Sequence, residues 1–362
     1  MGFRCGIVGL PNAGKSTIFN ALTAAGAPQE AFPFCTVEPN RHAVAVPDER
    51  LDALAALYKP QKVVPTTLEI VDIAGLVQGA SRGEGLGNQF LGHIKDVDAV
   101  LHVVRCFRDE NVAHPHGRVD PVEDAQVVDL ELVLRDAQTV ANKRDRLHKR
   151  AHSDKSVREE LAEVERVLAD LEAGVPARRQ DLSDAARGAV ADCMLLTDKP
   201  VLYVANVSED QVGDEAAVAP VRELARAQGA GLVVVAGRAE AEVSELDPGE
   251  RGPFLEALGL GESSLGRLIR AGYELLGLVT MFTVLSNEVR AWTLPARTPV
   301  PQAAGRIHTD MEQGFIRAEV VPVRELLDLG GEAAARGAGK IRTEGKDYRV
   351  QDGDVVRIRF RA

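Results

Sequence analysis

The chain has 362 residues, of which 45% are hydrophobic and 27% are charged, proportions typical of a soluble globular protein. This length leaves room for two or three domains with separate cores. No uninterrupted apolar run approaches the roughly 20 residues that span a bilayer, so no membrane helix is expected. The formal net charge of −11 repels nucleic acid on average, and any RNA contact must therefore use a local basic patch.

The cysteines indicate a reducing compartment. They lie far apart and form no CxxC pair, which argues against disulfides and zinc sites and favours a cytoplasmic protein. The four are Cys5, Cys35, Cys106 and Cys193. We expect Cys35 to be a buried, inert thiol. The first ten residues, MGFRCGIVGL, are too short and too rich in glycine for a signal peptide, so we interpret them as a buried strand.

In the first part of the chain, apolar runs alternate with helical segments. Six runs have the length and composition of strands, at residues 3–8, 41–46, 67–71, 99–104, 200–205 and 232–235. Strands that are covered on both faces are continuously apolar. The pattern therefore predicts an α/β domain with a parallel sheet and helical crossovers.

The sequence GLPNAGKS at residues 9–16 matches GxxxxGK[ST], directly after the first strand and before an apolar helix. Glycines let backbone N–H groups curl around phosphate oxygens, and the helix N-terminus adds positive potential. In such a loop Lys15 reaches the β- and γ-phosphates, and the Ser16 hydroxyl ligates Mg²⁺. The motif predicts a P-loop that binds a nucleoside triphosphate.

Two later motifs have the positions of nucleotide switches. Thr36, in a proline-flanked loop, is placed to ligate Mg²⁺ and to sense the γ-phosphate. Asp72 closes an apolar strand and begins a DxxG sequence, so it would hold Mg²⁺ through water while the Gly75 amide contacts the γ-phosphate. The next residue is Leu76, where many GTPases carry the glutamine that orients water. Catalysis therefore needs another residue or a partner.

Residues 121–195 contain no strand-like run. Apolar residues recur at steps of three and four in two segments, with a polar break at 152–156. This pattern predicts an antiparallel helical coiled-coil arm inserted into the α/β domain. Around the expected tip, residues 143–158 carry seven basic and two acidic residues. This cluster either binds RNA phosphates in a salt-dependent manner or is a solvated helix face.

The tetrapeptide NVSE at 206–209 follows another buried strand, where a GTPase carries Asn-Lys-x-Asp. In that motif the aspartate pairs with the N1 and N2 hydrogens of guanine, and the lysine packs along the base. Val207 and Glu209 replace them here, so the guanine-specific contacts are lost and ATP should be tolerated or preferred. The alternative is that this tetrapeptide is a loop unrelated to base binding.

After residue 276 the pattern changes to short strands, turns rich in proline and glycine, and a short helix at 323–329. Strands are predicted at 279–285 and 289–293, and a turn at Asp352-Gly353 precedes a final strand. These features predict a small α+β or barrel-like module. Along the last strand, Arg357, Arg359 and Arg361 share one face, which is either a second RNA surface or a solvated face.

Taken together, these motifs resemble the Obg-like ATPase (YchF) family, of the TRAFAC class of P-loop NTPases, over essentially the whole chain. The similar segments are GLPNAGKST, FPFCTVEPN, DIAGLVQGASRGEGLGNQFL, NVSE, AWTLPARTPVPQAAGRIHTDMEQGFIRAEV and EGKDYRVQDGDVVRIRF. The resemblance implies a G domain at 1–120 and 196–277 with an inserted helical coiled-coil arm at 121–195. It also implies a C-terminal α+β TGS domain of ubiquitin-like fold at 278–362.

The resemblance further implies roles for individual residues. The expected phosphate-binding residues are Asn12, Ala13, Gly14, Lys15, Ser16 and Thr17. The expected Mg²⁺ ligands are Ser16, Thr36 and Asp72. The expected neighbours of adenine are Asn206, Val207 and Glu209. The expected catalytic groups are Lys15, the Gly75 amide and His114.

Two of these assignments rest on the family alone. Family members lack the water-orienting glutamine and use a histidine from a flexible loop, and His114 matches the position of that histidine. Without the resemblance, His114 would be interpreted as a solvated loop residue. Asn12 has the type and position that coordinates K⁺ in related NTPases, which makes K⁺ a candidate activator. Residues 236–238 depart from the family's serine–alanine pair, so only backbone contacts to the base are expected there.

The resemblance implies a cytoplasmic, monomeric ATPase that hydrolyses Mg·ATP to ADP and phosphate and acts as a nucleotide switch in translation. Its expected partner is the ribosome, notably the large subunit, with rRNA contacts through the basic tip and the TGS domain and no membrane contact. One alternative is a GTPase of ribosome assembly. Another is a nucleotide-gated RNA-binding adaptor with incidental hydrolysis, which Leu76 favours.

Overall fold

The computed structural model describes residues 3–25, 40–73, 94–151, 154–257, 259–260 and 263–361. Its contacts divide the chain into two compact units. The first unit contains residues 1–43 and 69–272, and the second contains residues 44–68 and 273–362. Within the described ranges, no helix is both long and apolar enough to cross a bilayer.

The six predicted strands form one sheet, with every boundary within one residue of that expected. Its strand order is β2-β4-β1-β5-β6-β7. The strands are β1 (Arg4–Val8), β2 (Arg41–Ala45), β4 (Thr67–Asp72), β5 (Ala99–Arg105), β6 (Val201–Asn206) and β7 (Gly231–Val235). From β4 to β7, neighbouring strands are parallel. The carboxyl ends of these strands therefore lie at one edge, where open α/β sheets bind ligands.

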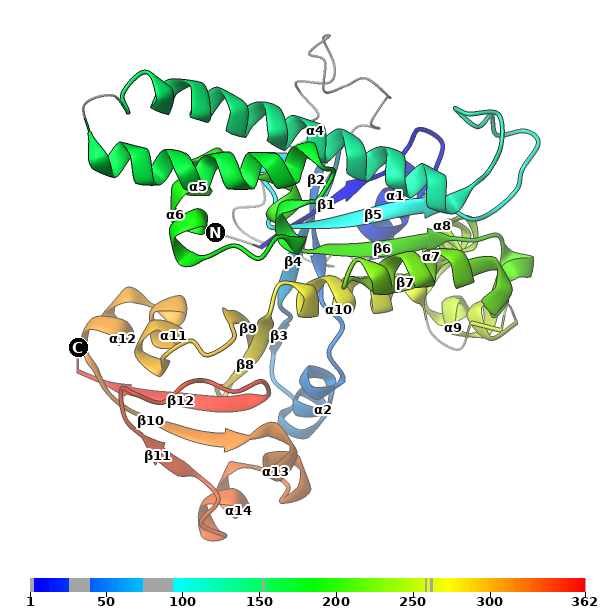
Figure 1. Cartoon of the computed structure of the whole chain (residues 1–362). Coiled ribbons are helices and arrows are strands. Elements are labelled where there is room, and N and C mark those ends of the chain that lie inside the picture. The colour runs from blue at the N-terminus through cyan, green and yellow to red at the C-terminus, as the bar shows by residue number, and fades with distance from the viewer. Residues whose placement is uncertain are drawn as a thin grey trace. The chain divides into compact units, whose positions relative to one another are not determined.

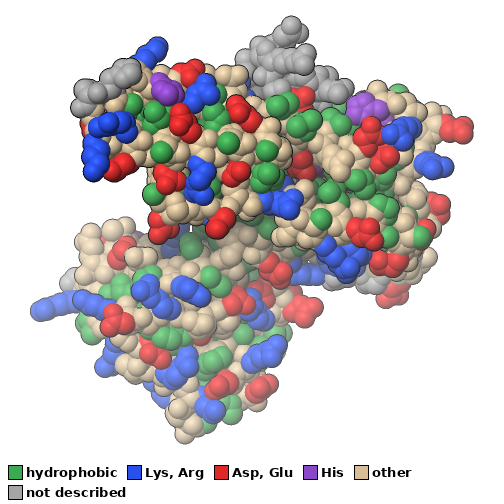
Figure 2. All heavy atoms as spheres, in the orientation of Figure 1, with side chains coloured by type: hydrophobic (Ala, Val, Ile, Leu, Met, Phe, Trp, Pro, Cys, Tyr) green, Lys and Arg blue, Asp and Glu red, His purple; other side chains and the backbone are tan. Residues whose placement is uncertain are grey.

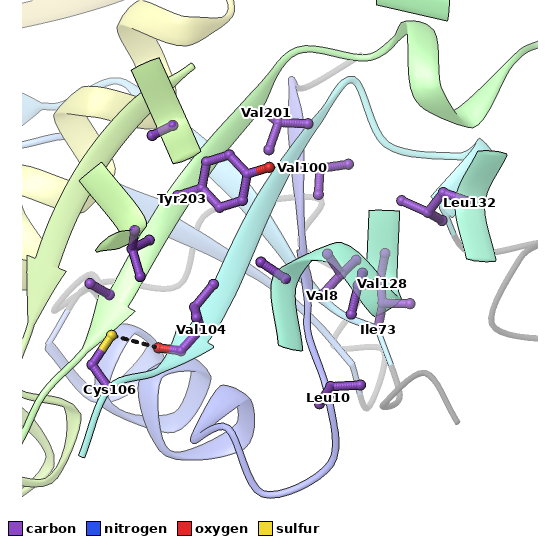
Figure 3. Packing of buried hydrophobic residues seen from close by; sticks show 14 of the residues in the cluster. Val8, Leu10, Ile73, Val100, Val104, Cys106, Val128, Leu132, Val201 and Tyr203 are labelled. Carbon is purple, nitrogen blue, oxygen red and sulfur yellow. Dashed lines mark hydrogen bonds between the residues drawn. The ribbon is translucent and has the colours of Figure 1, made fainter. Parts of the chain in front are cut away.

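Helices pack around this sheet (Figure 1); α1 and α7 connect its strands, and α8, α9 and α10 follow β7. They include α1 (Lys15–Ala25), α7 (Glu215–Ala227), α8 (Gly237–Glu245), α9 (Pro248–Ala257) and α10 (Ser264–Leu275). Every residue of β5 and β6 is buried, as expected for central strands covered on both faces. Figure 3 shows side chains of β5 and β6 packed with Val128 and Leu132 of the next helix in one apolar cluster.

The predicted helical pair is present as α4 (Pro121–His148) and α5 (Lys155–Glu172), which run antiparallel side by side (Figure 1). Each begins at an aspartate cap, because Asp120 accepts from Glu123 N–H and Asp154 accepts from Ser156 N–H. The two helices share an apolar cluster with the short helix α6 (Asp184–Val190). We call α4 and α5 the arm; residues 152–153 at its tip lie outside the described residues.

A buried carboxylate fixes the arm to the chain that follows it. Asp136 of α4 is 2% exposed and accepts hydrogen bonds from Leu196 N (2.9 Å), Thr197 N (2.8 Å) and Thr197 Oγ1 (2.6 Å). Burial raises the pKa of Asp136, and these three donors oppose that shift. The carboxylate thereby satisfies two backbone amides that would otherwise be buried without acceptors.

The second unit holds a sheet of order β11-β10-β12-β8-β9-β3. Its strands are β3 (Lys62–Val64), β8 (Leu278–Val284), β9 (Glu288–Pro295), β10 (Phe315–Pro322), β11 (Arg342–Glu344) and β12 (Asp354–Phe360). Its helices are α2 (Glu49–Tyr58), α11 (Val300–Ile307), α12 (Thr309–Gln313), α13 (Val323–Asp328) and α14 (Glu332–Gly337). The predicted strands β8, β9 and β12 and the predicted helix α13 are confirmed, whereas β3, β10 and β11 were missed.

Residues 44–68 belong to the second unit, whereas we predicted them within the G domain. Leu51 and Leu54 of α2 are buried in a cluster with Phe282 of β8. Arg50 pairs with Asp352 at 2.6 Å, and β3 pairs in parallel with β9. These partners are hundreds of residues away in sequence, so the local pattern could not reveal them.

The Asp136 contact predicts a large and specific loss of stability. Asp136→Ala leaves two buried amides and a hydroxyl without an acceptor, so we expect the free energy of unfolding to fall by about 2–4 kcal/mol. Asp145→Ala, at an exposed position of the same helix, should change it by less than about 0.5 kcal/mol. Chemical denaturation followed by circular dichroism measures both; equal effects of the two substitutions would contradict this role of Asp136.

Candidate functional site

The P-loop joins β1 to α1, and two of its glycines are required by their surroundings. Gly9 has φ +153°, and a Cβ there would lie 2.4 Å from the Val103 carbonyl oxygen. Gly14 has φ +93°, and a Cβ there would lie 2.1 Å from Nδ2 of Asn206. Neither position accepts a side chain without displacing a neighbour. The glycines of the motif thus let the loop curl tightly at the carboxyl edge of the sheet.

Lys15 begins α1 with its side chain folded into the loop. It is 6% exposed, and its Nζ donates to the Leu10 carbonyl oxygen at 2.8 Å. Burial lowers the pKa of Lys15 to about 8, and the negative charge of Asp72 opposes this shift. A partly desolvated ammonium with one carbonyl acceptor is suited to bind anionic oxygens that enter the loop.

Ser16 and Asp72 provide a fitting pair of ligands for Mg²⁺. The Ser16 hydroxyl lies 3.3 Å from Oδ2 of Asp72, and Oδ1 of Asp72 is buried without a hydrogen-bond partner among the described residues. Burial raises the pKa of Asp72, while Lys15 and the Ser16 hydroxyl oppose that shift. A hard cation with bound water would satisfy the unpaired oxygen, and hydroxyl and carboxylate oxygens are the ligands that Mg²⁺ prefers.

Asn206, the last residue of β6, connects the P-loop to α8. Its side chain is buried; Nδ2 donates to the Ala13 carbonyl oxygen at 2.9 Å, and Oδ1 accepts from Gly237 N–H at 3.0 Å. We predicted Asn206 as a neighbour of adenine. Both ends of its amide are occupied by backbone groups, so the residue joins the P-loop to the start of α8. Its place beside adenine stays a prediction.

A cavity of about 720 Å³ lies beside the P-loop. Its lining includes Gly14, Thr17, Asn206, Val207, Ser208, Glu209, Arg238 and part of the segment 107–112. The Val207 side chain is buried, whereas Glu209 is exposed at the start of a short 3₁₀ helix (Glu209–Gln211). The structure thus brings the P-loop and the predicted base-binding tetrapeptide to the same cavity, which has the size of a small-molecule site.

His114 lies on the loop after β5, with its side chain turned inward. The side chain is 6% exposed, and its Nε2 lies 2.8 Å from Oδ2 of Asp124 on α4. Its Nδ1 accepts from His116 N–H at 3.1 Å, so Nε2 carries the hydrogen and donates to Asp124. Burial raises the pKa of Asp124, and the hydrogen bond from His114 opposes this. His114 is therefore held by Asp124 in the described conformation.

Arg105 is a residue that the sequence analysis missed. It ends β5 and is 3% exposed, and its guanidinium donates to the backbone carbonyls of Phe107, Asp109, Val112 and Ala113 at 3.0–3.4 Å. Asn12 of the P-loop also donates to the Ala113 carbonyl, at 3.0 Å. These bonds fix the segment that lines the cavity and precedes His114. A charged residue at the end of a continuously apolar strand was the available signal.

Several predicted residues lie outside the described part of the chain. They are Cys35, Thr36, Gly75 and Leu76. The other three cysteines are free and buried, and burial raises the pKa of Cys5 and of Cys106 to about 12.

The contacts of Arg105 predict a local change in dynamics. Arg105→Met keeps an apolar stem of similar length but removes the guanidinium hydrogen bonds to the carbonyls of residues 107, 109, 112 and 113, so amide exchange in this segment should accelerate about tenfold or more. Arg108→Met, at an exposed position in the same segment, should leave the exchange rates unchanged. Hydrogen–deuterium exchange with mass spectrometry measures this; unchanged protection in Arg105→Met would show that the guanidinium does not hold the segment.

Two family models match the chain. Residues 4–143 match a model described as a 50S ribosome-binding GTPase. Residues 278–361 match a model named for the C-terminal part of YchF GTPases and described as a protein of unknown function.

Curated relatives match over almost the whole length. The chain is 51% identical over 361 residues to a ribosome-binding ATPase YchF of Escherichia coli O157:H7, covering 99% of both chains. It is 50% identical over 364 residues to the ribosome-binding ATPase YchF of Bacillus subtilis, covering 99% of this chain and 100% of the relative.

Solved structures agree with this likeness. The Schizosaccharomyces pombe YchF GTPase is 37% identical with a TM-score of 0.89, covering 99% of this chain and 98% of that one. A GTP binding protein of Pyrococcus horikoshii, at 20% identity, 99% and 100% coverage and a TM-score of 0.63, shares the fold. The full-length identity of about one half and the P-loop G-domain fold show that this chain belongs to the YchF family.

Proposed function

We propose that this chain is a ribosome-binding ATPase that hydrolyses ATP to ADP and phosphate and acts as a nucleotide switch in translation. The observation that carries the proposal is one cavity bounded by the P-loop and by Val207 and Glu209. The lysine–aspartate pair that would select guanine is absent from this tetrapeptide. The curated relatives at 50–51% identity are named ribosome-binding ATPases, which supports both parts of the proposal.

The phosphate chemistry follows from the P-loop side chains. On binding ATP, Lys15 would exchange the Leu10 carbonyl for β- and γ-phosphate oxygens, where its charge stabilises the negative charge that develops during transfer. Mg²⁺, when bound by Ser16 and Asp72, would neutralise charge on the same oxygens. Thr36 would complete this ligand set, and the Gly75 amide would contact the γ-phosphate. Asn12, Ala13, Gly14 and Thr17 would cradle the phosphates.

His114 would position the attacking water after leaving Asp124. The Asn12 side chain donates to the carbonyl of Ala113, directly before His114. Phosphate oxygens that recruit the Asn12 amide would compete with this bond and loosen the histidine segment. Once Nδ2 of Asn12 donates to phosphate instead of to Ala113, Oδ1 of Asn12 would be available to K⁺, our proposed activator. Nucleotide binding and the release of His114 would then be linked through one side chain.

The basic tip of the arm is the proposed rRNA contact, on the large subunit. Figure 2 shows Lys and Arg side chains at the end of the arm. Lys143 pairs with Glu160 and Asp192, and Lys155 pairs with Glu159. Lys149 and Arg158 are exposed, and among the described residues no carboxylate lies within 4 Å of either, so their charge is accessible to phosphate.

The second unit, which we propose to be the TGS domain, offers a weaker basic face. Arg357 pairs with Glu332 at 2.7 Å and Arg359 pairs with Glu319 at 3.3 Å, so their charges are largely offset. This favours the solvated-face interpretation of the final strand over a second RNA surface. We propose a monomeric protein that acts in the cytoplasm, where ribosomes are available.

Two alternative functions require other properties of the nucleotide site or of ribosome binding. A GTPase of ribosome assembly requires a clear preference for GTP, which needs contacts to guanine that Val207 and Glu209 do not supply. A nucleotide-gated adaptor with incidental hydrolysis requires ribosome binding that does not depend on turnover. The inward position of His114 is compatible with an enzyme that is slow until a partner releases the loop.

Ribosome-stimulated turnover tests the enzymatic part of the proposal. Steady-state ATP hydrolysis should rise about tenfold or more with ribosomes, and His114→Ala should remove most of that rise because positioning of the attacking water is lost. His308→Ala, at an exposed position outside the arm, is the matched control and should behave as wild type. Little turnover with ribosomes, together with unaltered ribosome binding by His114→Ala, would favour the adaptor instead.

Charge reversal at the arm tip tests the RNA contact. Lys149→Glu with Arg158→Glu should weaken co-sedimentation with ribosomes, and the difference from wild type should shrink as salt rises, because phosphate contacts depend on counterion release. The same charge change at Arg187 and Arg226, exposed residues of α6 and α7, should have little effect. Equal losses in the two double variants would indicate a general charge effect and exclude a specific tip contact.

A further inference from the structure

Three side chains with metal-binding atoms meet where the loop after β5 joins α4. His114 Nε2 lies 2.8 Å from Asp124 Oδ2, and His116 Nδ1 lies 3.7 Å from Asp124 Oδ1. When one ligand atom is taken from each side chain, the three atoms all lie within 4.8 Å of one another. The side chains of His114 and Asp124 are each 6% exposed, and that of His116 is 26% exposed. The group is thus mostly buried but can be reached from solvent through His116.

The donor set selects a class of ion. Two imidazole nitrogens and one carboxylate oxygen suit Zn²⁺ and similar ions, whereas Mg²⁺ prefers oxygen ligands only. Bonds of about 2.0–2.2 Å in a tetrahedral site separate ligand atoms by about 3.3–3.5 Å. The distances of 2.8 Å to Oδ2 and 3.7 Å to Oδ1 of Asp124 lie within about half an ångström of that range. All pairs of ligand atoms lie within 4.8 Å, so a bound ion would draw the side chains together by a small movement. Three protein ligands would leave a fourth position for water.

We propose that His114, His116 and Asp124 form a binding site for a Zn²⁺-class ion that is separate from the Mg²⁺ site at Ser16 and Asp72. The bound ion would join the loop to α4 and hold His114 in its inward position. ATP turnover would then be inhibited, a consequence that rests on the proposed role of His114. The existence of the site does not depend on that role.

Binding requires one rearrangement of hydrogen atoms. His114 now carries its ring hydrogen on Nε2, because Nδ1 accepts from the His116 amide. On metal binding Nε2 gives up this hydrogen, Nδ1 takes one, and the His116 amide turns away from the ring. The loop at 114–116 must therefore shift slightly. Asp124 stays in place, because it belongs to the first turns of α4.

The main competing interpretation is a simple His114–Asp124 hydrogen bond with no metal function. His116 distinguishes the two. In the hydrogen-bonded pair the His116 imidazole is dispensable, whereas in the metal site it supplies one ligand of three. His116→Ser therefore weakens metal binding while it retains His114, Asp124 and the hydrogen bond from the amide of residue 116 to Nδ1 of His114. Its partial exposure makes the substitution compatible with folding, which thermal melting without metal would verify.

Metal binding by the full-length, tag-free protein is the first measurement. Competition against a chromophoric zinc chelator should show one Zn²⁺ per chain, and His116→Ser should weaken this binding about tenfold or more. His148→Ser should retain wild-type affinity, since His148 pairs with Glu165 on the arm. Co²⁺ should give the visible spectrum of a tetrahedral site without thiolate absorption. Binding that is absent, or that is equally tight in His116→Ser, would overturn the proposal.

Inhibition is the second measurement. With excess Mg·ATP, Zn²⁺ at saturating concentration should lower turnover by wild type and by His148→Ser but not by His116→Ser. Full turnover by the zinc-loaded wild type would refute the claim that the ion restrains His114. If the chain proved inactive toward ATP, the proposed function would fail, while chelator competition would still decide whether the metal site exists.

Discussion

The buried amide of Asn206 is the contact on which the site depends. One side chain holds the Ala13 carbonyl of the P-loop and the Gly237 amide at the start of α8. Its side chain also leaves no room for a side chain at Gly14 or Gly237, because a Cβ at either position would lie within 3 Å of the Asn206 amide atoms. Strand β6 is central and fully buried, so the amide is presented from a rigid support. The P-loop and the segment at 206–209 are therefore positioned together, as a preorganised site requires.

A second set of contacts relates this site to the arm. Arg105 and Asn12 hold the segment that ends in Ala113, and the next residue, His114, is hydrogen-bonded to Asp124 on α4. Further along α4, Asp129 accepts a hydrogen bond from Tyr203 of β6 at 2.8 Å. The arm is thus joined both to the loop beside the nucleotide and to the central sheet. A nucleotide that binds the Asn12 side chain would weaken the contact between the loop and α4 but leave the Tyr203–Asp129 hydrogen bond in place. Phosphate binding would in this way affect the arm.

Much of the first unit could be predicted from local sequence. Continuous apolar runs gave the six strands, and steps of three and four gave the arm, because these periods are imposed by the backbone itself. The P-loop and the NVSE tetrapeptide were found at the carboxyl ends of strands and meet at one cavity. What could not be predicted depends on contacts distant in sequence. The neighbouring sequence does not show that residues 44–68 belong to the second unit, where Arg50 pairs with Asp352. It also does not show that backbone groups bind both ends of the Asn206 amide.

His114 illustrates the same limit at the level of a single side chain. A histidine in a loop would by itself be expected to face solvent, but Asp124, ten residues later in sequence, holds the His114 side chain inward. Arg105 was missed because a strand-ending arginine has no motif, although its carbonyl contacts organise the loop that precedes His114. In both cases the chemistry is set by a partner that the sequence alone does not identify.

The central claim is that the cavity beside the P-loop does not select guanine. The most direct test is equilibrium competition of ATP and GTP, each with Mg²⁺, against one fluorescent nucleotide bound to the protein. The account predicts that ATP displaces the probe at a concentration equal to or below that of GTP, because Val207 and Glu209 cannot form the guanine contacts. Displacement by GTP at a concentration about tenfold lower than ATP would contradict it.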